Sequence, residues 1–247
     1  MKLKCLSCEA LARMVYYCAA QTPHVVDVEV FRLGLHNEPK SLRARLQEAI
    51  DANIGAGYDA IVMAYALCGQ ATAGLVARDV PLVIPRAHDC ITLFLGSRAR
   101  YQQEFVDHPG TYWYALDYMQ RRDKSSTSLA LGSGLDNTDI QSVYHEYVEK
   151  YGEDNADYLM EVMGAWQNHY RRAAFIDVGV GDGTPVADLA QDEAERRGWS
   201  FDRVVGDLAL VRNLLFGDWN DDYLEIPPGQ RIAMAYDDQI MRCVPAE

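Results

Sequence analysis

The sequence has little positive charge and no long hydrophobic run. Its 247 residues contain 23 Lys and Arg against 36 Asp and Glu, a formal net charge of −13. Nucleic-acid-binding proteins usually present a basic face to the phosphate backbone, so this balance argues against a nucleic-acid partner. The apolar runs AIVMAYALC and PLVIP fall far short of the about 20 residues that a membrane-spanning helix needs. We therefore expect neither nucleic-acid binding nor a membrane span.

Cysteine is also scarce. Six cysteines in a chain of this size are too few for a disulfide-stabilised scaffold. The N-terminal MKLKCLSC does not lead into the apolar stretch of a signal peptide. We therefore expect a cytoplasmic protein whose thiols are reduced and available to a metal ion.

The first ninety residues alternate between strand and helix patterns. Strands are expected at 2–7, 25–33, 59–67 and 80–85, and helices at 9–20, 42–53 (capped by Ser41) and 73–78. Such alternation is typical of parallel strands joined by helical crossovers. The sequence predicts an α/β fold with an open, mostly parallel sheet and helices on both faces.

The rest of the chain continues this pattern less regularly. The expected elements are a helix at 91–105, a loop or lid at 123–139, a long helix at 138–170, a strand at 173–180, a helix at 186–199, a strand leading into a short helix at 201–215, and a turn and strand at 227–236. We expect a single α/β domain over 1–247. A division into two similar lobes, 1–120 and 138–247, around a crevice is compatible with this order.

Three cysteines and a histidine follow the ends of three expected strands. Cys8 follows the first strand, Cys68 the third, and His88 and Cys90 the fourth. The carboxyl ends of parallel strands meet at one edge of a sheet, so these four residues are expected to lie close together. Three cysteines and a histidine are a standard ligand set for zinc, and three thiolates also hold iron–sulfur clusters. We predict a metal centre, with zinc favoured and an iron–sulfur cluster as the alternative.

Neighbouring residues suggest how such a centre would work. Cys8 and Cys90 each precede a helix, whose N-terminus is expected to lower the pKa of the thiol. Arg86 is a candidate for binding an anionic group of a substrate, or else for an ion pair. Asp89 is a candidate for orienting His88, or else for capping the next helix. If His88 orients a substrate, three thiolates leave an open metal position for Lewis-acid chemistry.

A structural role is the alternative for each single cysteine, because free cysteine is common in protein cores. What sets the proposed ligands apart is their shared place at strand ends. The cysteines not expected to be ligands are Cys5, Cys18 and Cys243. Aromatic candidates for lining the crevice are Tyr65, Tyr112 and Trp113.

A glycine-rich run, DVGVGDG at 177–183, is superficially like the loop of class I S-adenosylmethionine methyltransferases. Too little chain follows it for the rest of such a sheet, and a lone glycine run is weak support for a nucleotide site. A tight turn, or a strand-end loop that brings Asp177 and Asp182 toward the crevice, is the simpler interpretation.

Longer strings resemble a prokaryotic family that is classed as a domain of unknown function. They are GYDAIVMAYALCG, PLVIPRAHDCITLFLGS, HPGTY, IDVGVGD and GWSF, and they span nearly the whole chain. The signature LCG…PRAHDC is the most specific of them. Members of this family are often encoded near corrinoid proteins and trimethylamine-type methyltransferases. The residues that the family pattern singles out are Cys8, Cys68, His88, Asp89 and Cys90.

The resemblance implies a place in corrinoid-linked methyl transfer or methylated-amine one-carbon metabolism. Together with the expected metal centre, it leads us to expect a metal-dependent transferase. Its partners would be a small-molecule substrate and a corrinoid protein. Two other classes stay open: a non-enzymatic metal or corrinoid accessory protein, and an iron–sulfur lyase or hydratase. Two positions depart from the family pattern, since Met14 lies near where relatives tend to have a glutamate and Ala66 where they often have a glycine.

Overall fold

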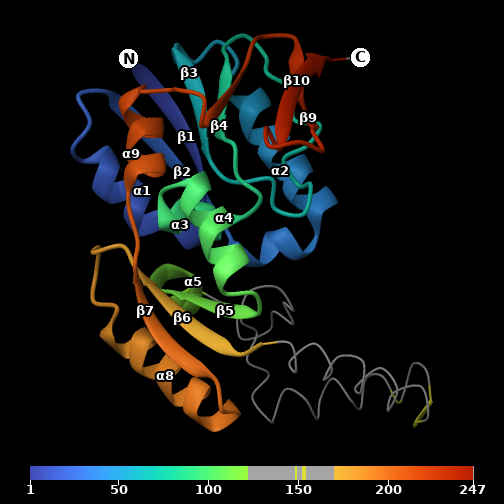
Figure 1. Ribbon diagram of the computed structural model, residues 1–247. Helices are drawn as coiled ribbons and strands as arrows, with labels where there is room; N and C mark the ends of the chain where they lie inside the picture. The colour runs from blue at the N-terminus through green and yellow to red at the C-terminus, as the bar shows by residue number, and fades with distance from the viewer. Residues whose placement is uncertain (122–147, 149–151, 154–169, 247) are drawn as a thin grey trace.

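The computed structural model describes residues 1–121, 148, 152–153 and 170–246 (Figure 1). The loop expected at 123–139 and most of the helix expected at 138–170 lie outside these residues. The described chain forms a mostly parallel sheet, a separate parallel sheet and a C-terminal hairpin. Within the described ranges, no helix is both long and apolar enough to cross a membrane.

The larger sheet has five strands in the order β2-β1-β3-β4-β8. These strands are β1 (Lys2–Cys8), β2 (Val25–Phe31), β3 (Ala60–Ala64), β4 (Leu82–Pro85) and β8 (Tyr223–Ile226). The first four are parallel, and β8 runs antiparallel to β4. Every residue of β3 and β4 is buried, as a strand covered on both faces requires. The predicted α/β fold with a mostly parallel sheet is confirmed.

Helices cover both faces of this sheet. The covering helices are α1 (Ala12–Ala19), α2 (Pro39–Ala52) and α9 (Ala209–Phe216). The short 3₁₀ helices η1 (Glu9–Leu11) and η2 (Leu33–Asn37) follow β1 and β2, and α3 (Cys90–Leu95) and α4 (Arg98–Asp107) lie toward the smaller sheet. Figure 1 shows α1 and α9 side by side on one face and α2 on the other. Leu42, Leu46 and Ile50 of α2 recur at helical spacing and are buried in the core of this sheet.

The smaller sheet consists of three parallel strands in the order β5-β6-β7. They are β5 (Thr111–Ala115), β6 (Arg172–Asp177) and β7 (Ser200–Val205), with α5 (Leu116–Gln120) after β5 and α8 (Thr184–Arg197) packed on the sheet. This sheet has its own buried cluster around Phe175 and Tyr112. Because α9 and β8 rejoin the larger sheet, the two sheets do not correspond to two halves of the chain.

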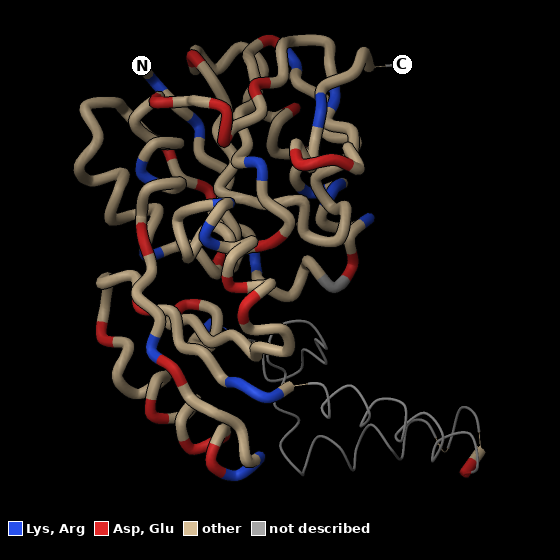
Figure 2. The backbone as a smooth tube through the Cα atoms, viewed as in Figure 1, with Lys and Arg blue, Asp and Glu red and all other residues tan. Residues whose placement is uncertain are grey.

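The C-terminus forms an antiparallel hairpin of β9 (Gln230–Met234) and β10 (Met241–Pro245). It packs on β8, at the end of the larger sheet away from β2. Figure 2 shows acidic residues along α8 and in loops of both sheets, in keeping with the net charge of −13.

Several local predictions are wrong for identifiable reasons. Residues 73–78 form turns and an isolated bridge at Val76, because the backbone at Gly74 takes a left-handed φ of +92°. Ser41 does not cap α2, since the helix already begins at Pro39, a residue favoured at the first helical position. The helix expected over 91–105 is divided in two at Gly96, which has a left-handed φ of +70°.

Candidate functional site

The three segments that carry the candidate cysteines end at the same edge of the larger sheet. Cys8 is the last residue of β1, and the parallel register pairs its neighbour Ser7 with Ala64 at the end of β3. Beyond β3 and β4 the two chains stay side by side. The backbone N–H of Cys68 donates to the carbonyl of His88, at 3.1 Å between nitrogen and oxygen. The strand-end geometry expected from the sequence is therefore present.

The three thiols lie close enough to influence one another electrostatically. Burial raises the pKa of Cys8 to about 11 and that of Cys68 to about 12, and the charge of Cys8 adds to the rise at Cys68. The pKa of Cys90 is raised well above its usual value, first by burial and then by Asp89, Cys68 and Cys8. These groups form one cluster of thiols, which we call the three-cysteine cluster (Cys8, Cys68 and Cys90).

The lowered thiol pKa values expected from helix N-termini are wrong. Cys8 caps η1 and Cys90 is the first residue of α3, but these helices have only three and six residues. Removal from water and the nearby negative groups favour the neutral thiols more strongly than so short a helix favours the thiolates.

Cys68 has an unusual backbone conformation. Its φ is +46°, in the left-handed region, and the next two residues, Gly69 and Gln70, also have positive φ values. A residue with a side chain adopts this region at a cost of about 1–3 kcal/mol, and such strain concentrates at ligand-binding and catalytic sites. The sharp turn after β3 therefore positions the Cys68 side chain at the expense of local stability.

His88 does not join the three-cysteine cluster. Its side chain is exposed, and it is not among the described groups that act on the three thiols. Its charge acts instead on Asp89. With the side chains as they stand, no three His, Cys, Asp or Glu residues of the described ranges are placed to hold a metal ion. The four-ligand metal centre therefore stays a prediction, and the structure brings together its three thiols.

Asp89 caps α3. Its Oδ1 accepts hydrogen bonds from the backbone N–H groups of Ile91 (3.0 Å) and Thr92 (3.4 Å), and its Oδ2 accepts one from the Tyr101 hydroxyl at 3.1 Å. Burial raises the pKa of Asp89, while these hydrogen bonds oppose the rise. Asp89 thus fixes the start of the helix on which Cys90 lies.

Arg86 donates hydrogen bonds to the C-terminal part of the chain. Its Nε donates to the carbonyl of Tyr223 at 3.2 Å, and its Nη1 donates to the carbonyls of Gln239 (3.0 Å) and Met241. These partners are main-chain carbonyls of β8 and of the β9–β10 hairpin rather than an acidic side chain. The predicted anion-binding role of Arg86 stays a prediction.

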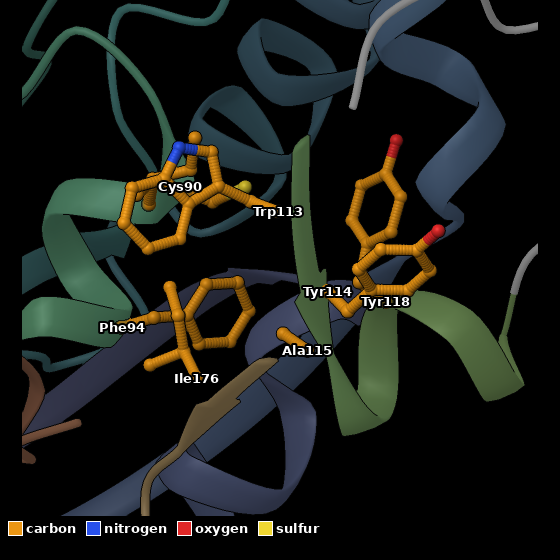
Figure 3. A pocket seen from close by; sticks show the side chains of 8 residues that line it. Cys90, Phe94, Trp113, Tyr114, Ala115, Tyr118 and Ile176 are labelled. Atoms are coloured by element: carbon orange, nitrogen blue, oxygen red, sulfur yellow. The ribbon is translucent and has the colours of Figure 1, made fainter. Parts of the chain in front are cut away.

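A small pocket lies between α3 and the smaller sheet, with Cys90 in its wall (Figure 3). The cavity volume is about 10 Å³, room for about one water-sized group. Its lining residues are Cys90, Ile91, Phe94, Trp113, Tyr114, Ala115, Tyr118 and Ile176. Figure 3 shows the Trp113 indole over Cys90, with Phe94 and Ile176 facing it. The lining is almost entirely apolar, so the pocket favours an uncharged or methyl-sized group.

The sequence predicted some of the residues that line this pocket but not the strand that supplies three of them. Trp113 was a candidate for lining the crevice, but the pattern did not predict β5, which supplies Trp113, Tyr114 and Ala115. The sequence signal for this strand is the run TYWY, because aromatic and β-branched residues favour strands. In the structure the run has alternating burial. A second small pocket shares Phe94, Ala115 and Ile176 with the first and is also lined by Met14.

The glycine-rich run after β6 forms tight turns. Oδ1 of Asp177 accepts a hydrogen bond from the N–H of Gly179 at 2.9 Å, and Oδ1 of Asp182 accepts one from the N–H of Thr184 at 3.0 Å. Both carboxylates thus bond to the local backbone, as in Asx-turns. Of the interpretations given for this run, the geometry matches a tight turn, which here leads into α8.

The fold and the site define an α/β protein with a cluster of three thiols at the carboxyl edge of its parallel sheet. Residues 30–215 match the family described as "Protein of unknown function (DUF1638)". This match covers more than half of the chain, so the protein belongs to that family. Cys68 and Cys90 lie inside the matched span, and Cys8 precedes it. No curated protein and no solved structure matches the chain.

Proposed function

We propose that the three-cysteine cluster binds a metal ion, with zinc favoured, and that the protein is a metal-dependent transferase. The observation that supports the proposal is that three thiols at neighbouring strand ends lie near enough to act on one another electrostatically. Cys8 acts electrostatically on Cys68 and Cys90, and Cys68 acts on Cys90. Burial and mutual repulsion favour the neutral thiols, and a bound cation would favour the thiolates instead. Three soft sulfur donors are a ligand set that suits zinc.

The exposed position of His88 favours a metal with an open fourth position. Zinc sites with four protein ligands are structural, whereas catalytic sites keep three protein ligands and one position for water or substrate. Zinc in the cluster would supply Lewis-acid chemistry that activates a thiol or amine acceptor. The apolar pocket next to Cys90 is suited to a methyl-sized group at that position. This arrangement favours a transferase over a non-enzymatic carrier, in which all four metal positions would be filled by protein ligands.

The reaction class rests on the resemblance to the corrinoid-associated family. We propose methyl transfer linked to a corrinoid protein or to a methylated amine. In this reaction the residues of the chain would position the acceptor and exclude water. Trp113 and Phe94 would enclose the transferred methyl group, while Asp89 holds α3, and with it Cys90, in place.

Metal analysis of anaerobically purified protein tests the metal centre. We expect about one zinc ion per chain, lost in Cys68→Ser and retained in Cys243→Ser. Cys243 is a suitable control because it is partly exposed on β10 and pairs with Ile232 in the hairpin. Full zinc retention by Cys68→Ser would contradict the shared site, and a brown protein with several irons per chain would favour the iron–sulfur alternative.

Demethylation of methylcobalamin in the presence of a thiol acceptor tests the reaction. We expect zinc-loaded protein to demethylate it, as measured by the change in corrinoid absorption, and Cys68→Ser to lack this activity. Zinc-loaded protein that binds methylcobalamin without demethylating it would favour the accessory class instead.

A further inference from the structure

Tyr65 has a buried hydroxyl at the edge of the three-cysteine cluster. The residue is 2% exposed, and within the described chain its hydroxyl oxygen has no hydrogen-bond partner. Phe31 packs against the ring, with a distance of 6.4 Å between ring centroids. Buried polar groups are nearly always hydrogen-bonded, so an unpartnered hydroxyl here needs an explanation.

The position of Tyr65 indicates which partner is available. It follows β3 directly, and the register that pairs Ser7 with Ala64 places Tyr65 beside Cys8 at the strand ends. After burial, the largest influence on the pKa of the Tyr65 hydroxyl is the charge of Cys8, followed by that of Cys68. The hydroxyl thus lies in the electrostatic field of the proposed metal ligands.

A neutral thiol is a weak hydrogen-bond acceptor, whereas a thiolate accepts a strong, charge-assisted bond. We propose that the Tyr65 hydroxyl donates a hydrogen bond to the sulfur of Cys8 when Cys8 is a metal-bound thiolate. Tyr65 is then a positioning residue that orients a ligand of the metal. This inference rests on the proposed metal site and gives Tyr65, expected from the sequence only to line the crevice, a role in orienting a metal ligand.

Tyr65→Phe tests the inference because it removes only the hydroxyl. In competition with a chelator, we expect zinc affinity to fall about tenfold to a hundredfold, the usual effect of losing a group that orients a metal ligand. In cobalt-substituted protein, the sulfur-to-metal charge-transfer band should move to lower energy, because the thiolate loses a hydrogen bond. Without metal, the thermal midpoint should be unchanged or raised, because an unpartnered polar group has been removed.

Tyr223→Phe is the matched control. Tyr223 is also a buried tyrosine, but its hydroxyl donates to the carbonyl of Leu210 at 2.7 Å. This variant should lower the thermal midpoint without metal and leave zinc affinity and the cobalt spectrum unchanged.

Three outcomes separate the inference from the metal site itself. Wild-type zinc affinity and an unshifted cobalt band in Tyr65→Phe would overturn the role of Tyr65 and leave the metal site standing. A loss of metal-free stability as large as that of Tyr223→Phe would show that the hydroxyl already bonds within the protein, and would also overturn it. Failure of the wild-type protein to bind zinc or cobalt would overturn the metal site and the role of Tyr65 together.

Discussion

At the scale of single residues, Cys68 combines a strained backbone with a place in the thiol cluster. A left-handed φ costs a residue with a Cβ atom about 1–2 kcal/mol relative to glycine. Natural sequences place glycine at such positions unless the side chain is needed. A role for the thiol in the proposed metal site would offset this conformational cost.

Two substitutions at residue 68 separate backbone strain from the thiol. Both Cys68→Gly and Cys68→Ala remove the sulfur, but only glycine also relieves the positive φ. Chemical denaturation without metal should show Cys68→Gly to be more stable than Cys68→Ala by about 1 kcal/mol. Equal stability, or a more stable alanine variant, would mean that the backbone at residue 68 is not strained.

His36 is expected to make stability depend on pH. Burial lowers its pKa below the ordinary value, and its ring stacks on Tyr118 with centroids 6.5 Å apart. The unfolded chain therefore binds this proton more readily than the folded protein does. The stabilising contribution of neutral His36 is present above about pH 6.5 and decreases as the pH falls through that value.

His36→Phe keeps an aromatic ring beside Tyr118 and removes the titration. The free energy of unfolding of the wild type should decrease more between about pH 7.5 and about pH 5.5 than that of the variant. The comparison cancels titrations elsewhere in the chain. Parallel pH profiles for the two proteins would refute the assignment.

At the scale of elements, Gly96 separates α3 from α4 and so sets where Cys90 lies. A Cβ atom at Gly96 would lie 2.6 Å from Cβ and 2.8 Å from the carbonyl oxygen of Asp207, and the residue has a left-handed φ of +70°. Both the backbone conformation and the close approach of the chain thus require glycine at this position.

Gly96→Ala should lower the free energy of unfolding by more than about 2 kcal/mol, the sum of left-handed strain and overpacking. Gly198→Ala is the control, because Gly198 has a similar φ of +67° but no atom within 4 Å of the added Cβ. That variant should lose only about 1 kcal/mol. Similar losses in the two variants would show that the contact with Asp207 is unimportant.

The elements that the sequence predicted well are those with strong periodicity or clear end signals. DAIVMAYAL predicted a buried strand, and β3 is buried throughout. The helix expected at 186–199 is α8, which ends at Arg197 with Gly198 as a left-handed C-cap. The misses are short strands such as β5 and β8, of five and four residues, which carry too few alternating positions to stand out.

The candidate site was predictable to the extent that it depends on topology. Parallel strand ends converge, so the placement of Cys8, Cys68 and Cys90 at one edge of the larger sheet followed from strand order and residue spacing. The orientation of single side chains did not follow. His88 is exposed, and Asp89 caps α3 through hydrogen bonds to the backbone, neither of which is visible in strand and helix patterns.

At the scale of the whole molecule, a buried carboxylate ties the two sheets together. Asp117 on α5, next to the smaller sheet, is 4% exposed. It accepts hydrogen bonds from the backbone N–H of Arg13 at 2.7 Å and from the Arg13 guanidinium, both on α1 of the larger sheet. Arg121 adds an ion pair at 3.4 Å. Arg13 and Asp117 also line the second small pocket.

Asp117→Asn should lower the free energy of unfolding by about 1–3 kcal/mol, because hydrogen bonds to a charged, buried group are lost or weakened. Asp51→Asn is the control, since Asp51 pairs with Arg78 at the surface with 42% of its side chain exposed. Its loss should stay below about 1 kcal/mol. Equal losses in denaturant titrations of the two variants would refute the role of Asp117 between the sheets.

The central claim, that three cysteines share one metal ion, is tested most directly by X-ray absorption spectroscopy of the zinc-loaded protein. The account predicts about three sulfur neighbours at about 2.3 Å from zinc and one lighter neighbour. In Cys68→Ser, one of these sulfur neighbours should be lost. A zinc shell of nitrogen and oxygen alone, or an unchanged number of sulfur neighbours in Cys68→Ser, would contradict the account.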